Sequence, residues 1–494
     1  MTESDSNFPT PDVSAEYPES EHWIWNGPNP PIARPFQEYM TQRWEEKPLE
    51  ESPHRAVEHT RRRRHAIHSL FPNHTLVIPN GGAKIRANDQ EFNFRPGSDF
   101  FWLSACDDPD AVLVVHAGTS DQSTLYLNER RDARTHEFFS NARHGELWVG
   151  PRRSLLDAER RWGIDTAPLE TLEKDLASSG DDLIVLRGFD DRVEDAVPSS
   201  DDGLLKRKLH ELRLIKDDYE IARLQEAVDT TVLGFEDVVR ALPLAVGRSE
   251  RVIEGIFNLR ARSDGNDTGY RTIAAAGAHA TILHWTRNDG EVRLGDLLLL
   301  DAGVESYDLY TSDVTRTLPI SGTFTREQRE IYDIVYAATQ AGIAAVRPGA
   351  RGQDQHRAAI RVLAEGLFDL GILDVGTEVS LRPELPLYAR YIVCGTSHML
   401  GVDVHDCTSA RDTIFPEDPL EVGNVLTVEP GLYFQANDLT VPERYRGIGV
   451  RIEEDVVVTN EGCRVMTAGL PSEPNELEAW MALLLAQPSS NILL

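Results

Sequence analysis

Residues 295–301 read GDLLLLD, a run of four leucines that ends in a carboxylate. The uninterrupted apolar character is typical of a strand buried on both faces. A charge at the end of such a strand is rarely a packing device, because an unpaired buried charge is costly. Asp301 is therefore predicted to be a functional acid at the end of a core strand.

A second aspartate follows in YTSDVTR, residues 310–316. If the chain turns near Tyr307, the flanking segments pair as antiparallel strands and place Asp301 opposite Asp313. Side chains that face each other in this way have Cβ atoms about 4.5–5.5 Å apart. Two bare carboxylates at that distance repel each other, so the arrangement requires a cation or a shared proton.

Two further segments also end in acids. In VLTVEPG, residues 425–431, Glu429 closes a strand before a Pro-Gly turn. In IGVRIE, residues 448–453, strand alternation places Gly449, Arg451 and Glu453 on one face. That face suits a site better than a core. Each acid alone is more simply a strand-end charge, whereas four in one domain favour a shared site.

Two histidines lie seven residues apart in SHMLGVDVHD, residues 397–406. Helical spacing would place both rings on one face, but Gly401 and the Val-Asp-Val alternation favour extended chain. The two rings are therefore expected to approach one point from different directions. The four acids carry a charge of −4, which two divalent cations would neutralise, and a hydroxide is a natural bridging ligand. Oxygen-rich ligation with one imidazole suits Mn²⁺, Co²⁺ or Zn²⁺.

The 494 residues divide by pattern into an extension and two domains. Residues 1–52 are rich in Pro, Glu and Ser without periodicity, which is typical of an extension. Residues 53–210 alternate helical patterns with short apolar runs, which predicts an α/β domain with a mixed sheet. The runs are 75–78, 99–103, 111–115, 125–127 and 183–186.

Residues 211–494 show a loosely repeated pattern. A helix from 217 to about 242, a break at Leu242-Pro243 and a helix at about 248–262 precede extended chain through Trp285. A helix from Glu327, a break at 347–349 and a helix at about 353–370 repeat the order before extended chain to His405. Two similar halves would place a site at their shared seam.

Composition excludes several classes of function. The net charge of −31 disfavours nucleic acid as a partner, and the run RRRR at 61–64 is interpreted as a solvated helix face. No apolar run is long enough to span a bilayer, and residues 1–12 lack a secretory pattern. Four scattered cysteines without C-x-x-C spacing favour a reducing cytoplasm.

Together these segments resemble the proline-specific metallopeptidases of the pita-bread fold, and among them most of all the bacterial X-Pro aminopeptidases. Residues 86–92 (RANDQEF) and 95–100 (RPGSDF) resemble the creatinase-type N-terminal domain of that family. The resemblance implies a two-domain α/β protein, with this N-terminal domain followed by a pita-bread catalytic domain of α+β type and pseudo-twofold symmetry. The remaining matching motifs are H284-W285, D301-x11-D313-V-T-R-T, the stretch 397–406, T427-V-E429-P-G and G449-V-R451-I-E453.

The resemblance implies two divalent cations among the strand-end side chains. Mn²⁺ is the expected metal, with Zn²⁺ and Co²⁺ as alternatives. Asp313 and Glu453 would each bridge both cations, and Glu429 would also carry a proton to the leaving nitrogen. The implied ligands are Asp301, Asp313, His398, Glu429 and Glu453.

Other residues are implied to handle the substrate. His284 and His405 would hold the scissile carbonyl, and Arg451 would belong to the network of side chains that contacts the metal ligands. Asp89, from the first domain, would lie near the free amino group of the substrate. Trp148 resembles a tryptophan that reaches a neighbouring subunit's site, which makes a homo-oligomer the expected assembly.

The implied reaction is hydrolysis of an N-terminal X-Pro bond by a metal-bridged hydroxide, releasing the first residue from peptides with proline second. A prolidase, which cuts only X-Pro dipeptides, is the alternative within the class. A non-catalytic pita-bread binding module is disfavoured because all five ligands are present. A hydrolase of a non-peptide C–N bond, such as that of creatine, would not need four converging acids.

Three positions depart from the family pattern. Eleven residues separate Asp301 from Asp313, where many relatives have ten, so a larger turn or a bulge is expected. Cys394 stands where many bacterial relatives have a histidine that lines the proline pocket. Trp285 replaces a commoner tyrosine, a change that is expected to be neutral.

Overall fold

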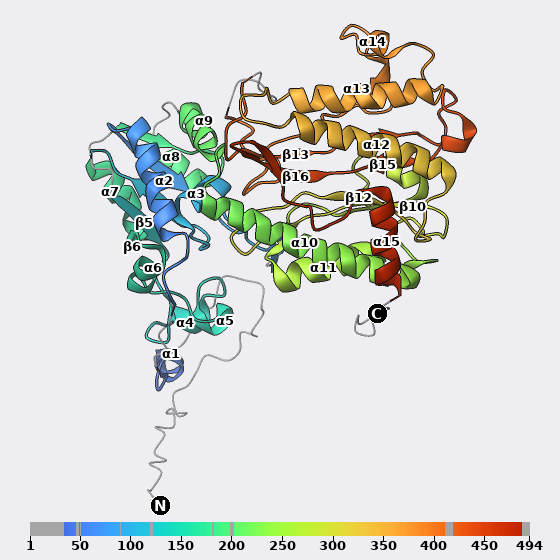
Figure 1. Ribbon diagram of the computed structural model, residues 1–494. Coiled ribbons are helices and arrows are strands. Elements are labelled where there is room, and N and C mark those ends of the chain that lie inside the picture. The colour runs from blue at the N-terminus through green and yellow to red at the C-terminus, as the bar shows by residue number, and fades with distance from the viewer. Residues whose placement is uncertain are drawn as a thin grey trace, which may run out of the picture. The chain divides into compact units, whose positions relative to one another are not determined.

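The computed structural model describes residues 34–45, 49, 51–88, 90–118, 122–179, 182–197, 202–410 and 418–486. The chain divides into two compact units, Met1–Asp202 and Gly203–Leu494 (Figure 1). Most of the predicted extension lies outside the described residues, and helix α1 (Arg34–Met40) is a described part of it. None of the helices in these ranges has the length and apolar content that crossing a membrane would require.

The first unit contains a five-stranded sheet of order β6-β5-β4-β1-β7. β1 pairs with β7 and β5 pairs with β6 in parallel, and the other pairs are antiparallel, which confirms the predicted mixed sheet. The strands are β1 (His74–Pro79), β4 (Val112–Val115), β5 (Ser123–Leu127), β6 (Asp165–Pro168) and β7 (Asp182–Val185). The other elements are the hairpin β2 (Ile85–Ala87) and β3 (Gln90–Glu91), and helices α2 (Val57–Leu70), α3 (Ser98–Ser104), α4 (Glu137–Ser140), α5 (Glu146–Val149), α6 (Leu155–Trp162), η1 (Leu169–Thr171), α7 (Leu172–Ser179) and α8 (Asp191–Ala196).

One predicted strand is a helix. The apolar run at 99–103 lies within α3, which starts after Gly97 and is buried along its length. A run this short has no periodicity that separates a strand from a buried helix. Arg63 and Arg64 of α2 donate hydrogen bonds to the carbonyls of Trp102 (3.1 Å) and Leu103 (2.8 Å), near the C-terminal end of α3. Both arginines are buried, so the predicted solvated face of 61–64 is wrong for these two residues.

The second unit is built around two helix pairs. α10 (Asp218–Ala245) packs with α11 (Arg251–Asp264), and α12 (Arg326–Ala345) packs with α13 (Asp354–Asp369). α10 begins at a capping box formed by Asp217 and Glu220. The predicted break at Leu242-Pro243 is wrong, because α10 continues to Ala245. Pro243 lies in the final turn, where one missing backbone donor disrupts little of the helix.

The strands of the second unit lie between these helix pairs (Figure 1). β12-β10-β9 form one sheet and β13-β16-β17 form another, each following its own helix pair in sequence, which confirms the predicted repetition. The strands are β9 (Ile273–Ala276), β10 (Leu297–Asp301), β12 (Thr315–Pro319), β13 (Val425–Val428), β16 (Glu454–Thr459) and β17 (Gly462–Val465), with two-stranded pairs of β8 (Asp267–Thr268) and β11 (Val304–Glu305), and of β14 (Gly431–Tyr433) and β15 (Gly449–Arg451).

Several short helices complete this unit. Two of the segments predicted as extended contain helical turns, at η2 (Gly277–Thr281) and at α14 (Thr377–Ser380) and η3 (Leu387–Arg390). Each has at most five residues, too few for a 3.6-residue period to be visible in sequence. The remaining elements are α9 (Asp202–Arg213), η4 (Glu443–Tyr445) and α15 (Pro474–Leu485).

A buried arginine joins the two halves of this unit. Arg316 of β12 forms an ion pair with Glu454 of β16 at 2.8 Å and is fully buried. It also donates hydrogen bonds to the carbonyls of Glu453 (2.7 Å), Leu470 (2.7 Å) and Pro471 (2.9 Å). A buried ion pair is stable only when its remaining donors are satisfied, as they are here. Arg316 thus fastens the strand after Asp313 to the second sheet.

Candidate metal centre

The five predicted ligand residues line one cavity of about 880 Å³ in the second unit. Asp301 ends β10, Asp313 precedes β12, Glu429 follows β13 and Glu453 follows β15. His398 lies in a segment alongside β13, where its N–H donates to Thr427 Oγ1 (3.1 Å) and its carbonyl accepts from the Thr427 N–H (2.9 Å). The four acids therefore come from the ends of separate strands, as the sequence predicted, whereas His398 belongs to none of the named strands.

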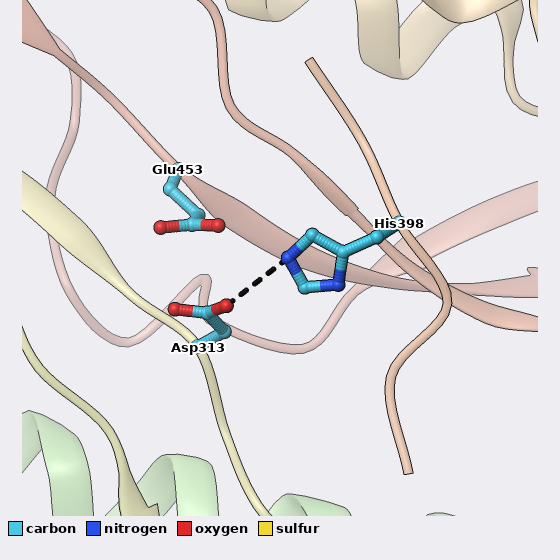
Figure 2. A group of neighbouring side chains, drawn as sticks. All are labelled: Asp313, His398 and Glu453. Carbon is cyan, nitrogen blue, oxygen red and sulfur yellow. Dashed lines mark ion pairs between the residues drawn. The ribbon is translucent and has the colours of Figure 1, made fainter. Parts of the chain in front are cut away.

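Three of these side chains form a compact cluster that could hold a metal ion. Asp313, His398 and Glu453 each offer a ligand atom, and these atoms all lie within 4.8 Å of one another (Figure 2). His398 Nε2 is 3.2 Å from Asp313 Oδ2 and 3.5 Å from Glu429 Oε1. An imidazole nitrogen facing several carboxylate oxygens is a donor set that suits a divalent cation.

The predicted pairing of the two aspartates is off by two residues. Asp301 pairs with Thr315 across β10 and β12, so Asp313 lies diagonally from Asp301. The bridge between Glu305 and Thr311 continues the same register, with no bulge between. The turn spans Ser306 to Tyr310, so the length of the 301–313 segment is accommodated in a turn.

Arg451 connects several side chains of the site. Its guanidinium donates to the Asp301 carboxylate, to the Tyr433 hydroxyl (2.9 Å) and to Thr315 Oγ1 (3.1 Å). Thr315 in turn donates to Glu453 Oε2 at 2.7 Å. Asp301 Oδ1 remains buried without a hydrogen-bond partner among the described residues, which leaves one ligand oxygen available for a cation.

The carboxylates are held in an environment that opposes their charge. Burial raises the pKa of Glu429 to about 7, with the charge of Asp313 adding to the effect despite nearby His398. Burial and the charge of Asp313 also raise the pKa of Glu453 well above its ordinary value. The pKa of Asp301 is raised by burial too. Crowded buried carboxylates of this kind are stabilised by cations, so the residues fit a divalent metal site.

The two histidines of the 397–406 segment meet at nearly right angles. Their ring centroids are 4.4 Å apart with an interplanar angle of 81°, which confirms that they approach one point from different directions. Burial alone would lower the pKa of His398, but the hydrogen bond to Asp313 and the charge of Glu429 raise it to about 9. Burial and the neighbouring His398 lower the pKa of His405. His284 and Cys394 line the same cavity.

A buried cluster behind His405 was missed by the sequence reasoning. Asp406 forms ion pairs with Arg213 and, at 2.9 Å, with Lys216, and all three side chains are buried. A side-chain carbon at Gly401 would lie 2.1 Å from Asp406 Oδ2, so only glycine allows this approach. The Gly401 carbonyl also accepts from the Thr311 N–H at 2.9 Å, which holds the histidine segment against the turn before Asp313.

Two more residues near the ligands were also missed. Asp455 is fully buried and its Oδ2 accepts a hydrogen bond from the Asp313 N–H at 3.1 Å. Extending the alternation of 449, 451 and 453 by one step would have found it. Tyr270 is partly buried, and its buried hydroxyl completes no hydrogen bond with a described residue. Burial and the charges of Asp301 and Asp313 raise its pKa.

The first unit carries two of the predicted substrate residues. Asp89 lies outside the described residues. Trp148 belongs to α5, is 44% exposed, and donates its indole N–H to the Phe139 carbonyl at 2.7 Å.

Comparisons with known proteins define the class. The profile of the aminopeptidase P N-terminal domain matches residues 59–183, and that of metallopeptidase family M24 matches residues 222–460. The protein is thus a metallopeptidase of family M24 with an aminopeptidase P-type N-terminal domain, and membership of this family implies divalent metal ions. This confirms the predicted fold class.

Individual relatives show to which group within this class the chain belongs. A Streptomyces coelicolor protein named Xaa-Pro aminopeptidase 1 is 50% identical over 465 residues, covering 93% of this chain and 94% of the relative. A variant of Escherichia coli aminopeptidase P solved in complex with substrate has a TM-score of 0.78 at 31% identity, covering 88% of this chain and 100% of that one. A zinc-substituted form of that enzyme in complex with product has a TM-score of 0.76 at 32% identity, covering 87% and 99%. The chain belongs to the Xaa-Pro aminopeptidase family.

Proposed function

We propose that the protein hydrolyses the first peptide bond of substrates with proline in the second position and releases the N-terminal residue. The observation that carries this proposal is the cavity in which five potential ligands meet two further histidines, His284 and His405. The names of its relatives support the same activity. An X-Pro bond is a tertiary amide without an N–H, so recognition must act on the carbonyl and on the shape of the proline ring.

The site residues are assigned to two divalent cations. When bound, the cations would activate a water molecule and polarise the scissile carbonyl. Oxygen-rich ligation with one imidazole supports Mn²⁺ as the metal, with Zn²⁺ and Co²⁺ as competitors. The proposed ligands are Asp301, Asp313, His398, Glu429 and Glu453, with Asp313 and Glu453 shared between the ions.

The chain's own side chains would orient the substrate and move protons. His405 and His284 would hold the scissile carbonyl, and a lowered pKa keeps the His405 ring neutral. Glu429 is suited to accept a proton from water and pass it to the prolyl nitrogen, because its carboxylate lines the same cavity as the proposed ligands and the two histidines. Arg451 would hold Asp301 in place through their ion pair.

Further assignments concern the whole chain. We propose domain boundaries after residues 52 and 210, and we propose that Asp89 lies near the substrate amino group. We also propose that the protein is cytoplasmic, a location that four free cysteines support.

A homo-oligomer in which Trp148 reaches a neighbouring copy's cavity is supported by the half-exposed side chains of Leu147, Trp148 and Val149. Light scattering of the full chain tests this assembly, and a monomer at micromolar concentration would contradict it.

The activity is tested with three peptides and manganese. Release of X from X-Pro-Y tripeptides, with no cleavage of matched X-Ala-Y peptides, is the expected result. Cleavage of the X-Pro dipeptide alone would make the protein a prolidase instead. Binding of the tripeptide without turnover in metal-loaded protein would favour a binding module.

A further inference from the structure

A buried carboxylate outside the metal centre organises the loop that carries His284. Glu250, at the start of α11, is fully buried and accepts four hydrogen bonds from that loop and the strand before it. Oε1 accepts from the Ala276 N–H (2.8 Å) and faces His279 Nδ1 (2.9 Å). Oε2 accepts from the Trp285 indole N–H (2.7 Å) and the Gly290 N–H (2.8 Å).

The same loop is packed tightly around Trp285. The His279 ring stacks on the indole with centroids 3.8 Å apart, and the Arg287 guanidinium lies 4.3 Å from the indole centroid. A side-chain carbon at Gly290 would lie 2.4 Å from the His279 ring and 2.8 Å from Glu250 Oε1, so the loop closes on the carboxylate without spare room. The Glu250 N–H also donates to the Gly290 carbonyl at 2.8 Å, which makes the contact reciprocal.

His284 depends on this arrangement for its position. It lies next to Trp285 in sequence and is itself exposed, yet it lines the cavity of the metal centre. Trp285 is only 6% exposed, so the fixed indole determines where the backbone of His284 lies. An apolar residue would fill the Glu250 position at a smaller desolvation cost, whereas only an acceptor with two oxygens can align four donors.

We propose that Glu250 is a positioning residue for His284, acting through the indole N–H of Trp285. The inference rests on the proposed peptidase function, in which His284 holds the scissile carbonyl. It also revises the expectation that tryptophan in place of tyrosine at 285 has no effect on function, because the indole N–H donates the hydrogen bond to Glu250. A shift of a substrate-holding group by about 1 Å lowers turnover by about a hundredfold, so a loosened loop would be visible in kcat.

The test combines Glu250→Gln with His284→Ala in the manganese-loaded full chain, using an X-Pro-Y tripeptide. The glutamine amide would present N–H groups to two of the four donors. We expect Glu250→Gln to lower kcat by about tenfold to a hundredfold, with an unchanged metal content. In the His284→Ala background the same substitution should cause no further loss, because the group it positions is gone.

Trp285→Phe keeps a ring in place and removes the indole donor, so it should lower kcat in the same direction even if Glu250→Gln fails to fold. Trp480→Phe on α15 is the matched control and should leave kcat unchanged. An equal loss from Glu250→Gln with and without His284, or wild-type kcat in Trp285→Phe, would overturn the proposal. Failure of the wild-type protein to cleave any X-Pro peptide would instead defeat the proposed function on which it rests.

Discussion

Glu429 combines ligand geometry with a raised pKa, which makes it the most informative single residue to change. Glu429→Gln keeps the shape of the side chain and removes its capacity to accept a proton. We expect kcat on an X-Pro-Y tripeptide to fall by about 10²- to 10⁴-fold, because general acid–base transfer contributes about that much. Circular dichroism should show an unchanged fold. Glu461→Gln, in the exposed turn between β16 and β17, is the control, and comparable rates for both variants would remove Glu429 from proton transfer.

Metal uptake should depend on pH through Glu429 and His398. Burial raises the pKa of Glu429 to about 7, and the bond to Asp313 raises that of His398 to about 9 against the effect of burial. Both groups must lose a proton to become ligands, so the affinity for Mn²⁺ should rise as the pH increases from 6 to 9. Competition titrations of the metal-free protein measure this, and an affinity that is flat over that range would contradict the prediction.

Among individual residues, the meeting of Asp301, Asp313, Glu429 and Glu453 in one cavity could be predicted, because acids at strand ends are conspicuous in sequence. The diagonal placement of Asp301 and Asp313 could not, since it depends on the length of the turn from Ser306 to Tyr310. The Asp406 cluster also escaped prediction, because its partners Arg213 and Lys216 lie about 190 positions away in the chain.

The segment 401–406 is held in place by the buried carboxylate of Asp406. Asp406→Asn would remove the buried counter-charge of Lys216 and one of those of Arg213, which keeps its ion pair with Asp403 at 3.0 Å. Arg213 and Lys216 now hold the pKa of Asp406 well below its usual range against the effect of burial. We expect the free energy of unfolding to fall by about 3–5 kcal/mol, measured by urea denaturation.

The control for this variant is Asp333→Asn on α12. The Asp333 side chain is 52% exposed and forms an ion pair with Arg329. Loss of this pair should lower the free energy of unfolding by less than about 1 kcal/mol. Equal stability of the two variants would mean that the buried cluster contributes no more than a surface pair. The type of short apolar segments was the hardest feature to predict from the sequence, because a five-residue run such as 99–103 fits a strand or a helix equally well until its neighbours are known.

For the whole molecule, metal removal should affect both activity and stability. Chelation with EDTA is expected to abolish turnover, and Mn²⁺ to restore it, because the buried carboxylates then regain their counter-charge. The thermal midpoint should fall on chelation, since a cation that binds only the folded state stabilises it. Differential scanning calorimetry checks this, and an unchanged midpoint in protein shown to be metal-free would contradict it.

The two-unit organisation and the repeated order of helices and strands were predictable from periodicity, whereas the contacts of Arg316 between the two sheets were not.

The contacts of Arg316 also bear on the rigidity of the site. Arg316 of β12 donates to the carbonyls of Leu470 and Pro471, which lie 154 and 155 positions further along the chain, and to the carbonyl of Glu453. Sliding one sheet past the other would break these bonds and leave a buried guanidinium without acceptors, which is costly. The two sheets should therefore resist shear, and the carboxylates that they carry should keep a constant spacing.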